Sequence, residues 1–174
     1  HKDAVHDVAV GECKPQIVSA SADGTVRLWD INTGRTMTTL THHKKGVRAV
    51  CFSPCDYTMG TAGERIKRWQ LPQGRFLHNT ADYQEPNSDI VVKTWNCLSI
   101  NQENIAAAGA DDGTVSFYDW PSGQLINTIK APLQPGSLEC EAGVLACAFD
   151  VTGTRLFTGD VDKSIKVYKE CDLE

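Results

Sequence analysis

The stretch Ser19–Asp30, SASADGTVRLWD, constrains the fold of this chain more than any other feature. A short apolar run, Gln16–Ala20, leads into Asp23-Gly24, and a second run, Thr25–Trp29, contains β-branched residues and an aromatic residue. Two strand-like runs joined by Asp-Gly predict a β-hairpin, because glycine adopts positive φ without steric cost.

The same pattern returns three more times along the 174 residues. The later copies, of which the first is the weakest, are Ile66–Trp69, Val115–Asp119 after Asp112-Gly113-Thr114, and Ile165–Tyr168 after Asp162-Lys163-Ser164. Trp69 lies 40 residues after Trp29, Tyr118 lies another 49 residues on, and Tyr168 another 50. A period of this length indicates a repeat architecture.

Each repeat has room for four short strands. In the first repeat we expect strands at 5–10, 16–20, 25–29 and 35–40, which together make one blade of a β-propeller. The sequence therefore predicts an all-β, single-domain propeller with repeats at about 1–40, 41–80, 81–129 and 130–174. The fourth repeat stops where its last strand is expected, so we predict three four-stranded blades, an incomplete last blade, and a fragment of a seven-bladed ring.

Composition and charge exclude several classes of protein. The net charge of -5 does not favour a general affinity for nucleic acid or anionic membranes. The apolar runs are far shorter than the roughly 18 residues of a membrane span. Seven cysteines without the spacing of a disulfide framework favour a reducing, intracellular compartment.

Four residues of the first repeat have the side chains needed for a structural hydrogen-bond network. His1, Ser19 (or Ser21), Asp23 and Trp29 can pass hydrogen bonds from indole to hydroxyl, imidazole and carboxylate. Ser, His and Asp are also the components of a hydrolase triad. The chain has no G-x-S-x-G motif, and the set recurs with the repeat, so we predict a structural tetrad and no catalytic residues.

Two cysteines and two histidines of the second repeat have the side chains of a metal site. Cys51 and Cys55 lie near His42 and His43 in the sequence, and all four side chains are possible zinc ligands. Cys51 falls in an expected strand and Cys55 in the following turn, and a second cysteine pair is missing from the sequence. We therefore expect buried or turn thiols, and neither a metal nor another cofactor.

Three features are candidates for partner binding. Lys44 and Lys45 belong to a small basic loop, which is either a solvated loop or a contact for RNA phosphates or an acidic partner. Trp120 follows a strand directly, and is either an exposed interface anchor or packed against its own blade. The long connection 130–143 is the strongest candidate, through Gln134, Pro135, Gly136, Ser137, Leu138 and Glu139. We expect this connection and the basic loop to share one side of the ring and to form one binding face.

Three stretches of the sequence resemble a known family: THHKKGVRAVCFSP (41–54), QPGSLECEAGVLACAFD (134–150) and DKSIKVYKE (162–170). They are similar to the last blades of the pleiotropic regulator family, nuclear WD-repeat proteins of the spliceosome associated with the nineteen complex. The resemblance implies a non-catalytic interaction scaffold in pre-mRNA splicing, located in the nucleus. Its partners would be other spliceosomal proteins, with RNA contact secondary and no membrane or small-molecule substrate. The alternative is a WD-repeat substrate receptor of a ubiquitin ligase, or another intracellular adaptor.

Overall fold

The computed structural model describes the chain except for residues 12–15, 81–92, 139–140 and 171–174. The described residues form fifteen β-strands. The strands are β1 (Val5–Val10), β2 (Gln16–Ser21), β3 (Val26–Asp30), β4 (Arg35–Leu40), β5 (Ala49–Phe52), β6 (Thr58–Ala62), β7 (Lys67–Gln70), β8 (Arg75–Asn79), β9 (Trp95–Ile100), β10 (Ile105–Ala110), β11 (Thr114–Asp119), β12 (Leu125–Lys130), β13 (Val144–Phe149), β14 (Arg155–Asp160) and β15 (Ile165–Lys169). This part of the chain contains no helix that is long and apolar enough to cross a membrane.

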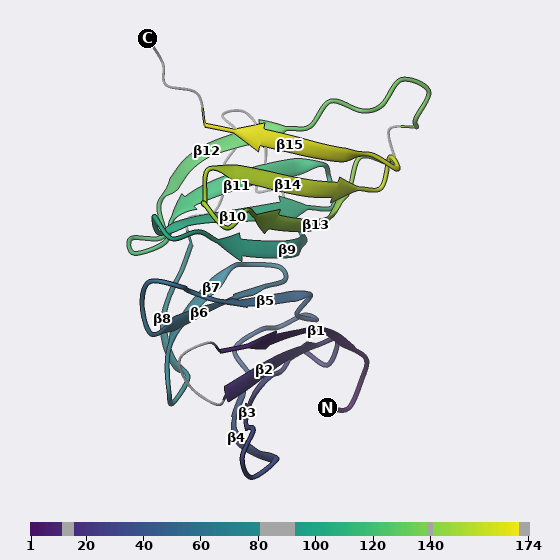
Figure 1. Ribbon diagram of the computed structural model, residues 1–174. Helices are drawn as coiled ribbons and strands as arrows, with labels where there is room; N and C mark the ends of the chain where they lie inside the picture. The colour runs from purple at the N-terminus through teal and green to yellow at the C-terminus, as the bar shows by residue number, and fades with distance from the viewer. Residues whose placement is uncertain (12–15, 81–92, 139–140, 171–174) are drawn as a thin grey trace.

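The strands form four antiparallel sheets in which sequence neighbours pair. Blade 1 contains β1–β4, blade 2 contains β5–β8 and blade 3 contains β9–β12, while the described residues of blade 4 form only β13–β15. Figure 1 shows the blades following one another from the N-terminus to the C-terminus. The first strands of successive blades lie against each other, as β1 with β5, β5 with β9 and β9 with β13. This is a propeller arrangement, and the predicted all-β propeller is confirmed.

The Asp-Gly turns have the geometry that the sequence predicts. Gly24 has φ +77°, and the Asp23 carboxylate accepts a hydrogen bond of 2.9 Å from the backbone N–H of Thr25. Gly113 has φ +82°, and a Cβ at this position would lie 2.2 Å from the carbonyl oxygen of Ala142. Glycine is therefore required at residue 113 both by backbone conformation and by the close approach of the next blade's connection.

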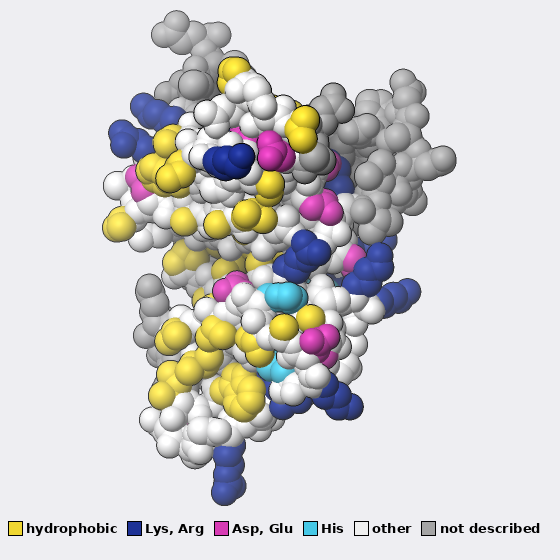
Figure 2. Space-filling model, turned by 90° about the vertical axis from the view of Figure 1, so that its right-hand side faces the viewer, with side chains coloured by type: hydrophobic (Ala, Val, Ile, Leu, Met, Phe, Trp, Pro, Cys, Tyr) yellow, Lys and Arg dark blue, Asp and Glu magenta, His cyan; other side chains and the backbone are white. Residues whose placement is uncertain are grey.

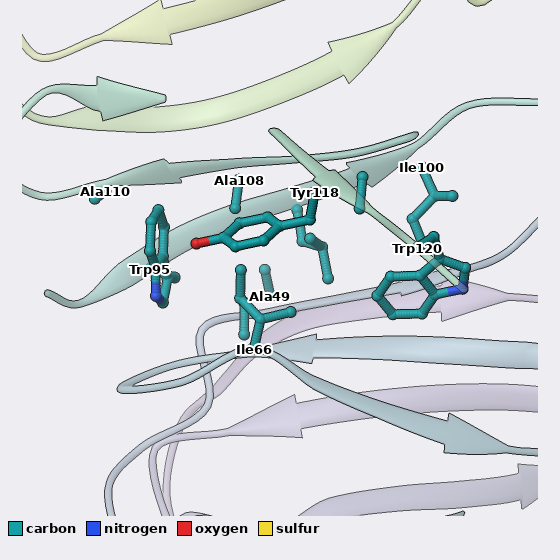
Figure 3. Packing of buried hydrophobic residues seen from close by; sticks show 11 residues of the cluster. Ala49, Ile66, Trp95, Ile100, Ala108, Ala110, Tyr118 and Trp120 are labelled. Atoms are coloured by element: carbon teal, nitrogen blue, oxygen red, sulfur yellow. The ribbon is translucent and has the colours of Figure 1, made fainter. Parts of the chain in front are cut away.

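The core lies between the blades. Blades 1 and 2 share a cluster that includes Leu28 and Trp69, and blades 3 and 4 share a smaller one that includes Val144. Between blades 2 and 3, Ile66 packs below the ring of Tyr118, and other buried residues of blade 3 surround it (Figure 3). Burying each large apolar side chain contributes about 1.5–3 kcal/mol. These clusters therefore fix each blade relative to its neighbours, and with it the connections between blades.

Candidate functional site

The structure brings the four tetrad residues of blade 1 together. The indole Nε1–H of Trp29 donates to Ser19 Oγ at 2.8 Å, and Ser19 Oγ lies 2.7 Å from His1 Nε2. His1 Nδ1 lies 3.3 Å from Asp23 Oδ2. The Ser21 hydroxyl instead donates to the backbone oxygen of Asp3, so Ser19 is the serine of the network.

The Asp23 carboxylate is held in its charged form. Burial alone raises its pKa, but hydrogen bonds from the Thr25 hydroxyl and from the backbone N–H groups of Lys2 and Thr25 outweigh this effect. The net result is a pKa well below the usual range. Ser19, with 5% of its surface exposed, is occupied by its two side-chain partners. This geometry ties the turn to β3 and leaves Ser19 poorly placed for attack on a substrate.

The network changes from blade to blade. In blade 2, His43 Nε2 lies 2.8 Å from Thr61 Oγ1, which also accepts a 2.9 Å hydrogen bond from Trp69 Nε1. Burial, together with the nearby charges of Lys67 and His42, lowers the pKa of His43 to about 3, so this imidazole is neutral at physiological pH.

In blades 3 and 4 the basic partner of the turn aspartate is a lysine, whereas in blade 1 it is His1; Lys93 precedes β9, but Lys166 lies on β15. Lys93 Nζ lies 3.0 Å from Asp112 Oδ2 and donates to Thr114 Oγ1 at 3.1 Å. Lys166 Nζ donates to Asp160 at 2.6 Å and to Asp162 at 2.9 Å. Sequence reasoning missed both lysines. A basic residue preceding each turn aspartate by roughly the spacing of His1 and Asp23 is the signal that identifies Lys93.

The two candidate loops lie at the same end of the sheets. In the β4–β5 connection, Val47 N–H donates to Ser21 O at the β2–β3 turn. In the β12–β13 connection, Gln134 N–H donates to Asp162 Oδ2 at the β14–β15 turn, which is the equivalent turn of blade 4. The β12–β13 connection and the N-terminus both lie on the right of Figure 1.

The tip of the β12–β13 connection is a tight turn with an exposed apolar side chain. Ser137 N–H donates to Gln134 O at 3.0 Å, which places Pro135 and Gly136 at the corner. Leu138 is 67% exposed, and its backbone N–H donates to Glu141 Oε2 at 3.2 Å. Glu139 lies outside the described residues. Lys44 and Lys45 are also exposed, on the β4–β5 connection.

The exposure considered for Trp120 is wrong. The side chain is fully buried, its Nε1–H donates to Thr58 Oγ1 of blade 2 at 2.9 Å, and the Arg68 guanidinium lies 5.4 Å from the ring centroid. Trp120 therefore packs between its own blade and the neighbouring one. The sequence does not show which groups a neighbouring blade supplies, so this partner could not be foreseen.

The two cysteines considered as zinc ligands serve other contacts. Cys51 is on β5, where burial raises the pKa of its thiol, and the Cys55 thiol donates to Gln102 O at 2.8 Å. Within the described part of the chain, no group of three or more His, Cys, Asp or Glu side chains is placed to bind a metal ion.

Comparisons with known proteins agree with this architecture. A family model described as WD domain, G-beta repeat matches residues 1–30. A second, described as Nucleolar protein 10-like, N-terminal domain, is a β-propeller model and matches residues 47–169, more than half of the chain. The chain belongs to the WD-repeat β-propeller family.

Within this family, the predicted similarity to pleiotropic regulators is confirmed. Protein pleiotropic regulator PRL2 of Arabidopsis thaliana is 40% identical over 138 residues, which are 79% of this chain and 27% of the relative. Pre-mRNA-splicing factor PRP46 of Candida glabrata is 38% identical over 138 residues, 79% of this chain and 31% of the relative. Pleiotropic regulator 1 of Bos taurus is 43% identical over 125 residues, 71% of this chain and 23% of the relative. The chain thus spans between about a quarter and a third of the length of these relatives.

Proposed function

We propose that this chain is a non-catalytic scaffold of pre-mRNA splicing that works in the nucleus with spliceosomal proteins. The observation that carries the proposal is about 40% identity, over 71–79% of the chain, to relatives named as pleiotropic regulators and pre-mRNA-splicing factors. The geometry supports a scaffold, because the Ser, His and Asp side chains that resemble catalytic groups are bonded to one another within the blade. The exposed connections between blades are available to a partner.

The docking surface that we propose is the loop face, formed by residues 134–138 together with Lys44 and Lys45. Both parts lie at the same end of the sheets, and Leu138 supplies an exposed apolar anchor. Figure 2 shows Lys and Arg side chains on the side of the molecule that carries these connections. An exposed apolar anchor suits a protein partner with an apolar pocket.

Affinity purification of the tagged chain from nuclear extract tests the function. We expect spliceosomal proteins and small nuclear RNA to co-purify with it. Recovery of a cullin adaptor without small nuclear RNA would instead support the alternative, a substrate receptor of a ubiquitin ligase.

A combined variant, Leu138→Ala with Lys44→Glu and Lys45→Glu, tests the loop face. We expect it to lose most co-purifying spliceosomal protein while its melting temperature stays unchanged. The matched control is Ile126→Ala with Arg155→Glu and Lys169→Glu, which makes the same changes at exposed positions away from the loop face. Equal recovery with the two variants would exclude the loop face as the docking site.

A further inference from the structure

Positive charge is concentrated in blade 2. Of the 17 Lys and Arg residues of the chain, seven lie in residues 41–80, against two of the 22 Asp and Glu residues. The chain as a whole carries a net charge of -5, so this blade is a basic region in an otherwise acidic protein. Such a region confines the attraction for anions to one part of the surface.

A shorter turn removes the carboxylate that the other blades place beside their basic residue. The strand register pairs Ser19 with Arg27 across residues 20–26, but pairs Thr61 with Lys67 across only residues 62–66. The shorter β6–β7 turn therefore has no counterpart of the Asp-Gly pair. Elsewhere, Asp23 bonds His1, Asp112 pairs with Lys93, and Asp160 and Asp162 pair with Lys166.

In blade 2, Lys67 and His43 have uncharged partners instead. Lys67 Nζ donates to the amide oxygen of Asn79 at 3.0 Å, and His43 bonds the Thr61 hydroxyl. Burial and the positive charge of Arg65 lower the pKa of Lys67, Glu64 opposes this effect, and Lys44 adds to it. Within the described residues, neither Lys44 nor Lys45 forms an ion pair. The repulsion among these cations is the kind that a bound anion relieves.

An exposed aromatic ring lies among these charges. The imidazole of His42 stacks on Phe76, with ring centroids 5.6 Å apart and an interplanar angle of 15°, and its side chain is exposed. Lys67 Nζ lies 5.6 Å from the centroid of the same Phe76 ring. An accessible flat ring beside several cations is the combination by which proteins bind single-stranded nucleic acid, through base stacking and phosphate contacts.

We propose that His42, Lys44, Lys45 and Lys67, here named the basic cluster, bind single-stranded RNA. The exposed Lys44 and Lys45 contact successive phosphates, the buried Lys67 adds positive charge beside them, and the His42 ring receives one unpaired base. The choice of RNA over an acidic protein segment follows from the exposed ring and rests on the proposed splicing function, which brings the chain next to RNA. The contact is independent of base sequence, because stacking and phosphate contacts are available with every base.

Fluorescence anisotropy with a labelled oligouridine and the purified 174-residue chain tests this site. Replacing Lys44, Lys45 and Lys67 together by Gln is expected to weaken binding at least about tenfold at low salt. For single strands, log K falls with log salt by about 0.7 for each phosphate contact, so losing the contacts of Lys44 and Lys45 should make the slope shallower by about 1.4. The double variant Lys44→Gln with Lys45→Gln changes only exposed side chains. If the triple variant unfolds, weaker oligouridine binding by this double variant is the expected result, and unchanged binding would contradict the proposal.

The matched control replaces Arg35, Arg75 and Arg155 by Gln, three exposed residues outside the basic cluster. It makes the same change in net charge and is expected to retain parental affinity. An equal loss of binding in the control would show a general charge effect and overturn the proposal.

Three further measurements separate RNA from other anions and locate its binding site. His42→Ala is expected to weaken oligouridine binding without changing the salt slope, because it removes stacking and no phosphate contact. An oligoglutamate peptide should bind less tightly than oligouridine of equal charge. If it binds as tightly and the same variants lose that binding, the ligand is an acidic protein segment and the RNA site is refuted.

Photocrosslinking of 4-thiouridine RNA should label residues 42–48 and 63–67, and labelling confined elsewhere would contradict the proposal. These results are obtained with purified chain and do not depend on co-purification from nuclear extract.

Discussion

Trp29 and Trp69 make equivalent hydrogen bonds in different surroundings. The indole of Trp69 is fully buried and donates to Thr61, which is also buried. Trp29 is only partly buried, although its partner Ser19 is enclosed. A hydroxyl that loses its donor costs more free energy where water cannot replace the lost partner. Comparing the two tryptophans therefore measures how strongly the stabilising effect of this hydrogen bond depends on burial.

Replacing Trp69 by Phe keeps an aromatic ring and removes the N–H group. We expect a loss of about 1–3 kcal/mol in the free energy of unfolding, against less than about 1 kcal/mol for Trp29→Phe. Trp69→Ala should cost about 3–5 kcal/mol, because it also leaves a cavity. Urea unfolding monitored by circular dichroism measures these values, and equal losses for the two Phe variants would contradict the argument.

His43 makes the stability of the protein depend on pH. Its pKa is about 3 in the folded chain and about 6.5 when unfolded, so between these values the unfolded state binds more protons. The contribution of neutral His43 to the free energy of unfolding is fully present above pH 6.5. It is lost as the pH is lowered, and the loss reaches about 2 kcal/mol at pH 5. His78, whose pKa is also lowered mainly by burial, acts in the same direction.

The comparison with His43→Gln isolates this contribution. The variant should be less stable at pH 7 but lose less stability between pH 7 and pH 5, as measured by urea unfolding at each pH. This window lies above the range in which the aspartates of the turns become protonated. A variant with the same slope as the parent would show that His43 is not the group responsible.

At the scale of strands, Gly60 on β6 allows blades 2 and 3 to approach closely. A Cβ at this position would lie 2.6 Å from Leu98 Cδ2 and 2.8 Å from the Trp120 ring. Gly60→Ala should therefore cost about 1–3 kcal/mol through overpacking. The cost should be smaller in a Trp120→Phe background, where the smaller ring leaves space, and a double-mutant cycle measures the difference.

Gly159 on β14 is the matched control for Gly60. A Cβ there has nothing within 4 Å, so Gly159→Ala should leave stability nearly unchanged. A comparable loss at the two positions would point to the intrinsic conformational preference of glycine and not to packing between blades.

The strands could be predicted where turns and alternation delimit them. β4 runs from Arg35 to Leu40 as expected, after a glycine turn at Gly34. β3 instead begins and ends one residue later than the expected 25–29, because Thr25 still belongs to the turn, where its backbone N–H donates to the Asp23 carboxylate. Periodicity therefore located the blades better than it located the ends of their strands.

The site was predictable only where the repeat motif contains it. The blade 1 network uses residues of the motif itself, and the structure joins them as expected. Lys93 and Lys166 depend on strand register and on the turn aspartates, and the burial of Trp120 depends on Thr58 in another blade. The two lysine pairs lie within one repeat but outside its motif, whereas the Trp120 contact arises from packing between repeats, about which a single repeat carries no information.

At the scale of the whole molecule, the blades are not equally coupled. Among the described residues, the cluster between blades 2 and 3 has eleven buried members and the cluster between blades 1 and 2 has ten, but the cluster between blades 3 and 4 has five. Blade 4 also exposes large apolar side chains on its three strands, among them Leu145, Phe157 and Ile165. In repeat proteins, stability is roughly the sum of each repeat and its interfaces with neighbours.

Blade 4 is therefore expected to open before the rest of the molecule. In native-state hydrogen exchange, the amides of β13–β15 should exchange first and as one group, while those of β6 and β10 exchange last. Leu156→Ala, which removes a buried side chain at the weak interface, should speed exchange in blade 4 and leave blade 1 unchanged. Leu28→Ala is the matched substitution at the interface of blades 1 and 2, and it should speed exchange there without changing blade 4. If the amides of all four blades exchanged at one common rate in the parent chain, the molecule would open as a single unit and the coupling between blades would be uniform.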